Sequence, residues 1–294
     1  MQTETAVFQE HRSRLYGIAY RMLGTKSDAD DMLQDAYVRW HDSDVESIRN
    51  PEAWLVTTIT RLCIDRLRIA RIERESYKGP WLPEPILSEA AVTPESQLEL
   101  ASDLSIALLV VLERLAPQER AAFLLHEVFD SEYAEIARIL GKTPAACRQM
   151  VHRALERVRR ERPRFQVSKL ERDRLLDRFV SAVKAGDKEA LVALFAENAT
   201  WTADGGGKAS AISKALRGAE RITKLVLGFV RRFGPGFSLR KATFNGETGL
   251  LMCVDGRLVT ALSLYTDGER ILAAYNVVNP DKLQEIARQL VPSN

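Results

Sequence analysis

One stretch near the middle of the chain constrains its fold more than any other. Residues 131–160 read SEYAEIARILGKTPAACRQMVHRALERVRR. Apolar residues recur at helical spacing up to Leu140, and Gly141 follows, where glycine adopts the left-handed conformation that ends a helix. Thr143 is placed to cap a second helix whose first residue is Pro144. The pattern predicts a helix-turn-helix, whose second helix enters the major groove of DNA.

The charge distribution supports a nucleic-acid partner. The whole chain is close to neutral, with a formal net charge of +2. Between residues 142 and 164, however, eight Lys and Arg residues stand against two acidic residues. A surface that binds phosphates needs such a local cluster, because counterion release grows with the number of phosphates neutralised. A helix face exposed only to solvent is the alternative for the charge by itself. Together with the helix-turn-helix pattern, the cluster favours DNA binding.

Length and composition indicate more than one domain and no disulfide or metal framework. At 294 residues the chain exceeds one small domain, and its 46% hydrophobic content allows buried cores. Cys63, Cys147 and Cys253 are far apart, so neither a zinc site nor a disulfide pair is expected. The first residues lack a signal-peptide pattern, and the longest apolar run is too short to cross a bilayer. We therefore expect a cytoplasmic protein with no metal, no cofactor and no membrane partner.

The first 75 residues read as three helices. Apolar residues from Phe8 to Met22 repeat at helical spacing, and Gly24 ends the first helix. Ser27 is expected to cap a second helix, which is strongly acidic. Asn50, followed by proline, is expected to begin a third helix that becomes basic toward its end. Residues 76–100 contain several prolines and are expected to form a linker.

After Pro163 the hydrophobic period changes from helical to alternating. Helices are expected over residues 169–185 and 187–195, and a longer one over residues 210–233. Four strand-like runs follow, at residues 237–244, 248–254, 257–266 and 270–278. They are separated by Asn245-Gly246, Asp255-Gly256 and Asp267-Gly268, dipeptides whose two residues both favour positive φ in a hairpin turn. The last third is therefore predicted to be an α+β domain with an antiparallel meander and a final helix from Asp281.

Three motifs of the helical part resemble, in the right order, those of the extracytoplasmic-function (group IV) sigma factors of bacterial RNA polymerase. They read SDADDMLQDAYVRW, NPEAWLVTTITRLCIDRLR and LAPQERAAFLLHEVFDSEYAEIARILGKTPAACRQMVHRALERVR. The resemblance covers about residues 1–162 and implies two all-α domains. These are a sigma-2-like helical bundle over residues 1–75 and a sigma-4-like helix-turn-helix domain over residues 101–164. The implied function is promoter-specific transcription initiation, with the polymerase core and promoter DNA as partners.

The resemblance assigns roles to three surfaces of this chain. Binding of the polymerase core is implied for Asp28, Asp31, Met32, Asp35 and Tyr37 on the acidic helix. Binding of the −10 element is implied for Arg61, Arg66, Arg68 and Arg71. The chain departs from the family pattern at Leu62, where many members carry Asn. Binding of the −35 element is implied for Thr143, Arg148, Gln149, His152, Arg153 and Arg157. Arginine pairs bidentately with guanine, and glutamine with adenine.

Residues 168–294 resemble a SnoaL-like domain of the NTF2-like fold, a cone of helices against a curved antiparallel sheet. Three short sequences resemble those of sigma factors that carry such a fused domain, namely WLPEP in the linker, DGGGK and NPDKL. The resemblance implies regulation in cis, with no separate anti-sigma factor as the main control. The implied regulatory or inter-domain residues are Trp81, Leu82, Pro83, Glu84, Pro85, Asp204, Gly205, Gly206, Gly207, Lys208, Asn279, Pro280, Asp281, Lys282 and Leu283.

Two other classes of function stay open at this point. A conventional repressor or activator with a ligand-sensing C-terminal domain would bind duplex DNA tightly without polymerase. An enzyme tethered to a DNA-binding module would need an acid/base residue, but all four histidines precede residue 153, which leaves Asp204. The sequence GGGKAS is not a phosphate-binding loop, because Ala209 stands where Ser or Thr is required. We expect no catalytic residue and leave open whether a small ligand fills the cone.

Overall fold

The computed structural model describes residues 4–87, 105–161 and 167–290, which form two compact units. The first unit contains residues 4–76 and 108–161, and the second contains residues 77–87, 105–107 and 167–290. The second part of the predicted linker, residues 88–100, lies outside the described residues, as do residues 101–104 and 162–164 of the predicted sigma-4-like domain. The domain boundaries remain a prediction. In the described part of the chain, no helix is long and apolar enough to cross a membrane.

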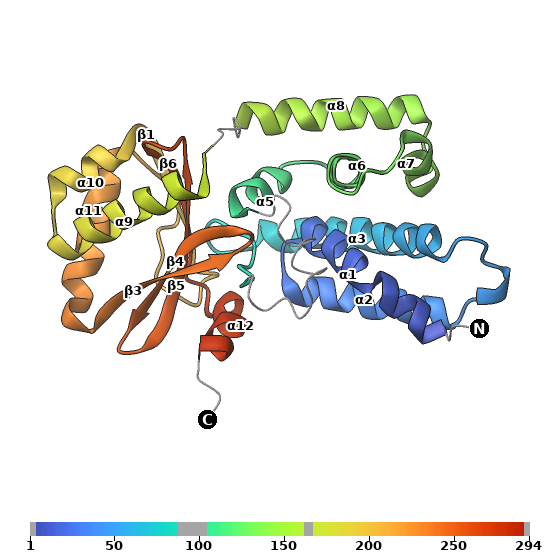
Figure 1. Ribbon diagram of the computed structural model, residues 1–294, viewed down its shortest axis with the longest axis horizontal. Coiled ribbons are helices and arrows are strands. Elements are labelled where there is room, and N and C mark those ends of the chain that lie inside the picture. The colour runs from blue at the N-terminus through green and yellow to red at the C-terminus, as the bar shows by residue number, and fades with distance from the viewer. Residues whose placement is uncertain (1–3, 88–104, 162–166, 291–294) are drawn as a thin grey trace. The chain divides into compact units, whose positions relative to one another are not determined.

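Three helices pack against one another in the first unit, α1 (Glu4–Leu23), α2 (Lys26–His41) and α3 (Pro51–Glu75), as Figure 1 shows. A short 3-10 helix, Val45–Ser47, precedes α3. Asn50 caps α3 as predicted, because its side chain accepts a hydrogen bond from the amide of Ala53 at 2.9 Å. The prediction that Ser27 caps α2 is wrong. Thr25 has the extended backbone that a cap requires, and its hydroxyl accepts a hydrogen bond from the amide of Asp28.

The first unit also contains the helix-turn-helix. Its helices are α6 (Pro117–Glu127), α7 (Tyr133–Leu140) and α8 (Pro144–Glu161), preceded by α5 (Ile106–Leu112). Gly141 ends α7 with φ of 62°, and the Thr143 hydroxyl accepts a hydrogen bond from the amide of Ala146 at 3.2 Å. One face of α8 is buried and packs against α6 and α7; its buried residues are Cys147, Met150, Val151, Ala154 and Val158. The predicted helix-turn-helix is confirmed.

A buried polar contact joins these two groups of helices within the first unit. Arg120 on α6 is only 1% exposed, and its guanidinium donates hydrogen bonds to the backbone oxygen of Arg21 at 3.0 and 2.8 Å. The same guanidinium pairs with Glu113, which also pairs with Arg74 on α3. Breaking a buried pair leaves an uncompensated charge and is strongly destabilising. The contact therefore fixes α6 against α1 and α3.

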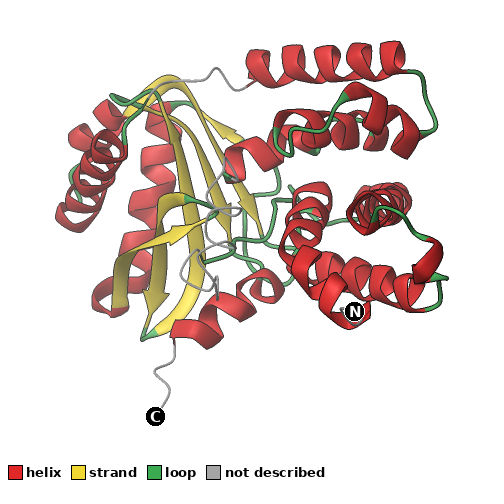
Figure 2. Cartoon of the chain, turned by 45° about the vertical axis from the view of Figure 1, so that its right-hand side comes forward, coloured by secondary structure: helices red, strands yellow, loops and turns green. Residues whose placement is uncertain are grey.

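The second unit is a six-stranded sheet with α9 (Lys169–Ala185), α10 (Lys188–Leu194) and α11 (Ala219–Phe233) over one face (Figure 2). The strands are β1 (Phe195–Asp204), β2 (Leu216–Arg217), β3 (Phe237–Phe244), β4 (Glu247–Val254), β5 (Arg257–Thr266) and β6 (Ile271–Val277). Their order is β2-β1-β6-β5-β4-β3. The 3-10 turn Gly234–Gly236 follows α11, and α12 (Pro280–Leu290) packs against β5. Strands β3 to β6 form the predicted antiparallel meander, but β1 runs parallel to β6, so the sheet is mixed.

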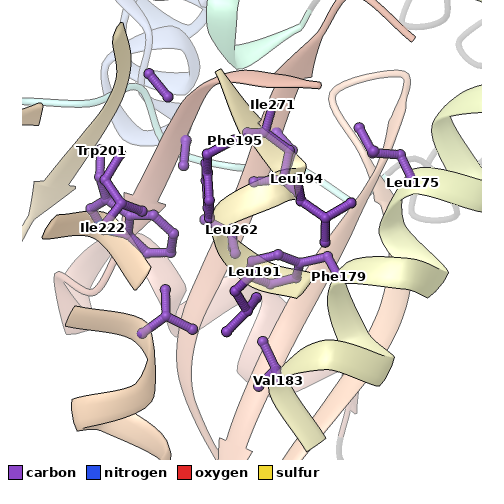
Figure 3. Packing of buried hydrophobic residues seen from close by; sticks show 14 of the residues in the cluster. Leu175, Phe179, Val183, Leu191, Leu194, Phe195, Trp201, Ile222, Leu262 and Ile271 are labelled. Carbon is purple, nitrogen blue, oxygen red and sulfur yellow. The ribbon is translucent and has the colours of Figure 1, made fainter. Parts of the chain in front are cut away.

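Apolar side chains from all three covering helices meet the sheet in one core (Figure 3). Phe179 from α9, Leu191 from α10 and Ile222 from α11 are fully or almost fully buried there. The rings of Phe179 and Phe195 meet edge to face, with centroids 6.2 Å apart. Helices packed over one face of such a sheet form the α+β arrangement of the NTF2-like fold. The predicted fold class is confirmed.

Three local predictions in this unit are corrected by the structure. The helix expected over residues 210–233 begins only at Ala219, because Leu216 and Arg217 pair with β1 and Gly218 has φ of 98°. The helix expected to end at Phe195 ends at Leu194, where β1 begins. Both residues of the first two turn dipeptides have positive φ, but Asp267 does not. Its carboxylate accepts hydrogen bonds from the amides of Glu269 and Arg270 and closes a longer turn.

Candidate functional site

The exposed face of α8 carries most of the residues predicted to contact the −35 element. Its opposite face is buried against α6 and α7, so helical periodicity leaves the side chains of Arg148, Gln149, His152 and Arg153 exposed. Thr143 is exposed at the start of the helix, where its hydroxyl already serves as the cap. The residues therefore share one surface, as major-groove recognition requires. Their contacts with bases remain a prediction.

Several basic side chains of this surface have partners inside the first unit. The guanidinium of Arg148 lies over the ring of Tyr133, 5.2 Å from its centroid. Arg153 pairs with Glu119 at 3.0 Å, and Arg157 donates to the backbone oxygen of Arg114 at 2.9 Å. These contacts with neighbouring residues of the first unit orient the three arginine side chains. The contact of Arg157 with the −35 element stays a prediction.

The predicted polymerase-binding residues on α2 divide into three groups. Asp31 and Asp35 are exposed to solvent. Asp28 is instead committed to the fold, because its carboxylate accepts hydrogen bonds from the Thr25 hydroxyl at 2.7 Å and from Arg66 at 2.8 Å. The half-buried residues, Met32 and Tyr37, lie nearer the core, and the ring of Tyr37 packs edge to face on Phe8. Only the first group presents free negative charge.

The four arginines predicted to bind the −10 element do not share one environment. Arg61 donates hydrogen bonds to the backbone oxygens of Ile139 and Arg138, at the C-terminal end of α7. Arg66 pairs with Asp28 and with Glu73 at 2.9 Å. Arg68 pairs with Asp65 on its own helix, and Arg71 is exposed. Arg61, Arg68 and Arg71 are exposed and Arg66 is half-buried, and the role of all four stays a prediction.

The structure brings the three motifs of the predicted regulatory set together within the second unit. Linker residues Leu82, Pro83, Glu84 and Pro85 are buried, and Trp81 is half-buried. Asp204 and Gly205 are buried at the end of β1, whereas Gly207 and Lys208 are exposed. At the start of α12, Asn279, Lys282 and Leu283 are buried, and Pro280 and Asp281 are exposed. We name the contact between these segments the linker latch.

Asp204 is the centre of the linker latch. Its side chain is fully buried and accepts hydrogen bonds from the Tyr77 hydroxyl at 2.6 Å and from the Leu82 amide at 2.8 Å. It also pairs with Lys282 Nζ at 2.8 Å. A buried carboxylate is tolerated only when it is paired and hydrogen-bonded. Two of the three donors that meet this requirement come from the linker, so the linker completes the environment of Asp204.

Lys282 ties the same elements together from α12. Its ammonium group donates a hydrogen bond to the backbone oxygen of Leu82 and lies 4.0 Å from the centroid of the Trp81 ring. An ammonium over an aromatic face gains a cation–π attraction that is stronger when desolvated, and Lys282 is 7% exposed. At the rim, Lys208 pairs with Asp281. The Lys282 ammonium thus contacts the linker through the backbone and through two aromatic rings, since the centroid of the Tyr77 ring lies 5.4 Å away.

Tyr77 was not found from the sequence, although it is part of the linker latch. Its hydroxyl donates to Asp204 and accepts a hydrogen bond from the Asn279 side chain at 3.0 Å. Burial, and then the hydrogen bond to Asp204, raises the pKa of this hydroxyl above its ordinary value. Gly206 lies against the same group, since a Cβ there would collide with the Asn279 carboxamide. The available signal was an aromatic residue four positions before Trp81 in the same linker.

The linker makes a second contact with the NTF2-like domain at Ile86, four residues after Leu82. The amide of Ile86 donates to the side chain of Asn245 at 3.0 Å, and the amide of Asn245 donates to the Ile86 oxygen at 2.9 Å. Leu87 forms an antiparallel bridge with Phe244. Asn245 also occupies the β3–β4 turn with φ of 55°. The linker is thereby held at two points over residues 77–87.

The residues described by the structure contain no cluster of His, Cys, Asp and Glu suited to a metal ion. Cys63 is fully buried, and this burial raises the pKa of its thiol. Asp204, the carboxylate considered above as an acid/base candidate, has its oxygens occupied by the linker and Lys282. The chemistry of the site is therefore that of binding a peptide segment.

Comparisons with known proteins agree with the geometry of both units. The sequence matches the family profiles "Sigma-70 region 2" over residues 7–71 and "Sigma-70, region 4" over residues 105–158. It is 38% identical to the ECF RNA polymerase sigma factor SigJ of Mycobacterium tuberculosis, over 95% of this chain and 93% of that protein. It is 28% identical to the probable ECF RNA polymerase sigma factor SigI of the same species, over 97% of each.

A solved structure extends the similarity to the fold of nearly the whole chain. The crystal structure of M. tuberculosis SigJ matches with a TM-score of 0.76 and 36% identity, covering 94% of this chain and 97% of that chain. Both sigma-70 regions and the C-terminal α+β unit fall inside this match. The chain therefore belongs to the extracytoplasmic-function sigma factors, the subunits that direct bacterial RNA polymerase to specific promoters.

Proposed function

We propose that this sigma factor is regulated in cis by its NTF2-like domain, which holds or releases the linker between the two DNA-reading domains. The observation that carries the proposal is the linker latch, in which buried Asp204 accepts hydrogen bonds from two linker residues, Tyr77 and Leu82. A surface that only stabilised the domain would not need donors from a segment so distant in sequence. A separate anti-sigma factor is then unnecessary as the main control.

Chain connectivity explains how holding the linker changes promoter binding. Tyr77 lies two residues after the end of α3, so a held linker ties the sigma-2-like helices directly to the NTF2-like domain. A released linker frees the chain between Glu75 and Ile106, which spans up to about 100 Å when fully extended. The separation available to the −10 and −35 readers therefore differs between the held and released states. Two packings that differ by a few kcal/mol are sufficient for a switch.

The contact of Arg61 with α7 belongs to the same proposal. Arg61 uses its Nε and one terminal nitrogen on the backbone oxygens of Ile139 and Arg138, so separation of α3 from α7 would free these donors for the backbone of an opened promoter strand. Linker release supplies the length of chain that this separation needs.

Polymerase binding is proposed to fall on the exposed acids of α2. Asp31 and Asp35 present negative charge, and the side chain of Val38 on the same helix is 50% exposed. A charged rim beside an exposed apolar residue suits a basic protein surface, because opposite charge steers association and fixes register. Asp31→Lys with Asp35→Lys should weaken core polymerase binding in a pull-down assay, whereas Glu269→Lys in an exposed turn of the NTF2-like domain should not.

Multi-round transcription with core polymerase tests the cis regulation. A genomic fragment pool and mapping of RNA 5′ ends would identify the promoter, on which linker variants are then compared. Tyr77→Ala with Trp81→Ala removes the latch from the linker side and leaves the buried core of the NTF2-like domain intact. Output should change several-fold relative to the unaltered chain, whereas Leu170→Ala, which truncates an exposed apolar side chain on α9, should leave it unchanged.

Truncation gives an independent check. One variant ends at residue 278 and loses Asn279 and Lys282 of the latch, and a second ends at residue 164. If the linker variant and both truncations transcribe like the intact chain, regulation in cis is wrong. Tight duplex binding without polymerase would instead favour an ordinary repressor or activator.

A further inference from the structure

The NTF2-like domain contains two adjacent cavities beside α11. The inner one has a volume of about 50 Å³ and is lined by apolar side chains from α9, α11 and the sheet, together with Thr260 and Asn276. The outer one has a volume of about 550 Å³ and lies between α11, residues 209–212 and the ends of β4, β5 and β6. Leu225, Phe229 and Met252 line both cavities and so form the partition between them.

The sizes of the two cavities restrict the shape of a ligand. An outer volume of about 550 Å³ lies within the range of small-molecule sites, about 300–1,000 Å³. The inner volume is smaller than the roughly 150 Å³ that accommodates a benzene ring. A slender alkyl chain therefore fits past the partition better than a ring does.

The charged residues that line the outer cavity all have the same sign. They are Lys224 and Arg232, and no Asp or Glu is among the lining residues. Neither side chain has an ion-pair partner among the residues that the structure describes; Arg232 lies 5.6 Å from the ring of Phe233. Two unpaired cations at the mouth of an apolar cavity favour an anionic group there.

The absence of a side chain at Gly228 leaves space in the outer cavity. It lies in the middle of α11, four residues from both Lys224 and Arg232, and lines the outer cavity. Glycine inside a helix costs about 1 kcal/mol relative to alanine. Packing does not require it, because a Cβ at this position would meet no atom within 4 Å. The space beside Gly228 is thus available to something other than the protein.

Asn276 provides a polar group deep in the inner cavity. The Thr260 hydroxyl has one proton and lies 2.8 Å from the Val277 oxygen, while the Asn276 carboxamide also hydrogen-bonds to this hydroxyl. The Asn276 carboxamide uses only one of its two polar atoms, the oxygen or the nitrogen, in its hydrogen bond with Thr260. The second polar atom has no hydrogen-bond partner among the described residues.

We propose that the two cavities form one binding site for an anionic amphipathic molecule with a slender alkyl tail. The anionic head lies between Lys224 and Arg232, and the tail passes Gly228 and the partition into the inner cavity. Medium-chain carboxylates have this chemistry. The effect of such a ligand on transcription rests on the cis regulation proposed above, whereas its binding does not.

The site shares two elements with the linker latch. Residues 209–212 line the outer cavity and directly follow the loop whose glycines lie against Tyr77 and Lys78. Val278 lines the same cavity, donates its amide hydrogen to the backbone oxygen of Asp204 at 2.8 Å and precedes Asn279. A ligand that orders these two segments stabilises the surface that holds the linker.

Calorimetric titration of the full chain with octanoate tests the site. We expect saturable binding of octanoate at one site. Octan-1-ol should bind at least about tenfold more weakly, because it lacks the charge. Lys224→Gln with Arg232→Gln should lose about the same factor, whereas Arg221→Gln on the same helix but outside these cavities should not. Gly228→Leu should abolish binding while favouring the helix. Absence of octanoate binding, or equal binding by octanol and by all variants, overturns the proposal.

Hydrogen exchange separates failure of the site from failure of the regulation. The amides of Leu82 and Ile86 report the held linker, because both are hydrogen-bonded to the NTF2-like domain. Saturating octanoate should slow their exchange several-fold in the wild type and not in Gly228→Leu. Binding with unchanged exchange overturns the link between site and latch. Slowed exchange with unchanged transcription overturns the cis regulation and leaves the binding site established.

Discussion

The hydroxyl group of Tyr77 donates a 2.6 Å hydrogen bond to Asp204 Oδ1, although 127 positions separate these residues in the sequence. The other oxygen of the same carboxylate accepts from the Leu82 amide and from Lys282. A buried carboxylate that lost its linker donors would keep only one of three partners. Exposure of the linker is therefore coupled to the energy of a charge inside the NTF2-like domain, which makes the contact sensitive to single substitutions.

Removing the carboxylate should be far more damaging than removing the whole ion pair. Asp204→Ala leaves the buried ammonium of Lys282 unpaired and should lower the free energy of unfolding by about 3–5 kcal/mol. Adding Lys282→Met replaces the second charge by an apolar side chain of similar length and should recover most of that loss. Urea denaturation of the three proteins measures the difference. A double variant no more stable than Asp204→Ala would contradict this account of the pair.

Tyr77→Phe should weaken the latch without leaving a clash. The hydroxyl is bonded to a charged group, and such a hydrogen bond contributes about 1.5–3 kcal/mol. Burial and Asp204 raise the Tyr77 pKa in the folded protein, so the neutral hydroxyl is favoured there. This stabilisation is complete below about pH 10, the pKa of an unfolded tyrosine, and is lost as the pH rises beyond it.

The pH dependence distinguishes this role from simple packing. The difference in unfolding free energy between wild type and Tyr77→Phe should be constant from pH 7 to 9 and shrink above about pH 10. Denaturant titrations at pH 8 and at pH 10.5 provide the comparison. A difference that does not change with pH would mean that Tyr77 stabilises the domain through its ring and not through its hydroxyl.

Gly206→Ala and Gly186→Ala form a matched pair of backbone tests. Both glycines have positive φ, 58° and 66°, so both substitutions strain the backbone by a similar amount, about 1 kcal/mol. A Cβ at residue 186 meets nothing within 4 Å, whereas one at residue 206 collides with Asn279 and approaches the Tyr77 hydroxyl. Gly206→Ala alone should therefore accelerate hydrogen exchange of the Leu82 amide. If both substitutions accelerated exchange of the Leu82 amide equally, the loop that contains Gly206 would not be part of the linker latch.

Promoter recognition should depend on the exposed side chains early in α8. Arg148→Ala and Gln149→Ala each remove a group suited to bidentate contact with a base, which carries about 1–3 kcal/mol of discrimination. Transcription from the mapped promoter should fall accordingly, by about tenfold or more for Arg148. On a template with a scrambled −35 element, wild type and variants should be equally weak. An undiminished difference on that template would mean that Arg148 contacts phosphate or protein instead.

Local rules predicted the meander and the helix-turn-helix because their signals lie within a few residues of one another. The bounds of β3 and β5 follow from alternation between turn dipeptides, and Gly141 with Thr143 sets the turn before α8. Strand β1 was missed because its partner, β6, lies about 70 residues further along the chain. Its register is also irregular between Phe195 and Thr200, so no alternating pattern marks it.

The candidate site was predictable as a set of motifs but not as a geometry. Similarity to a fused sigma factor grouped WLPEP, DGGGK and NPDKL, and the structure brings them together around Asp204. The sequence similarity did not indicate that Tyr77 belongs with these three motifs, because Tyr77 contacts Asp204 and Asn279, which lie far away in sequence. Similarly, nothing near Arg66 in sequence predicts its pair with Asp28, so the division of the α3 arginines emerges only from helix packing.

The bridge between Leu87 and Phe244 has a consequence for association between molecules. Strand β3 is the outermost strand of the sheet beyond β4, and the described part of the linker pairs with only its last residue. An unpaired edge strand invites strand addition by another chain, a route to aggregation. Arg240 and Lys241 are exposed on β3, and such charges protect natural sheet edges. In the released state proposed above, Arg240 and Lys241 would still protect the edge of β3 against strand addition by a second molecule.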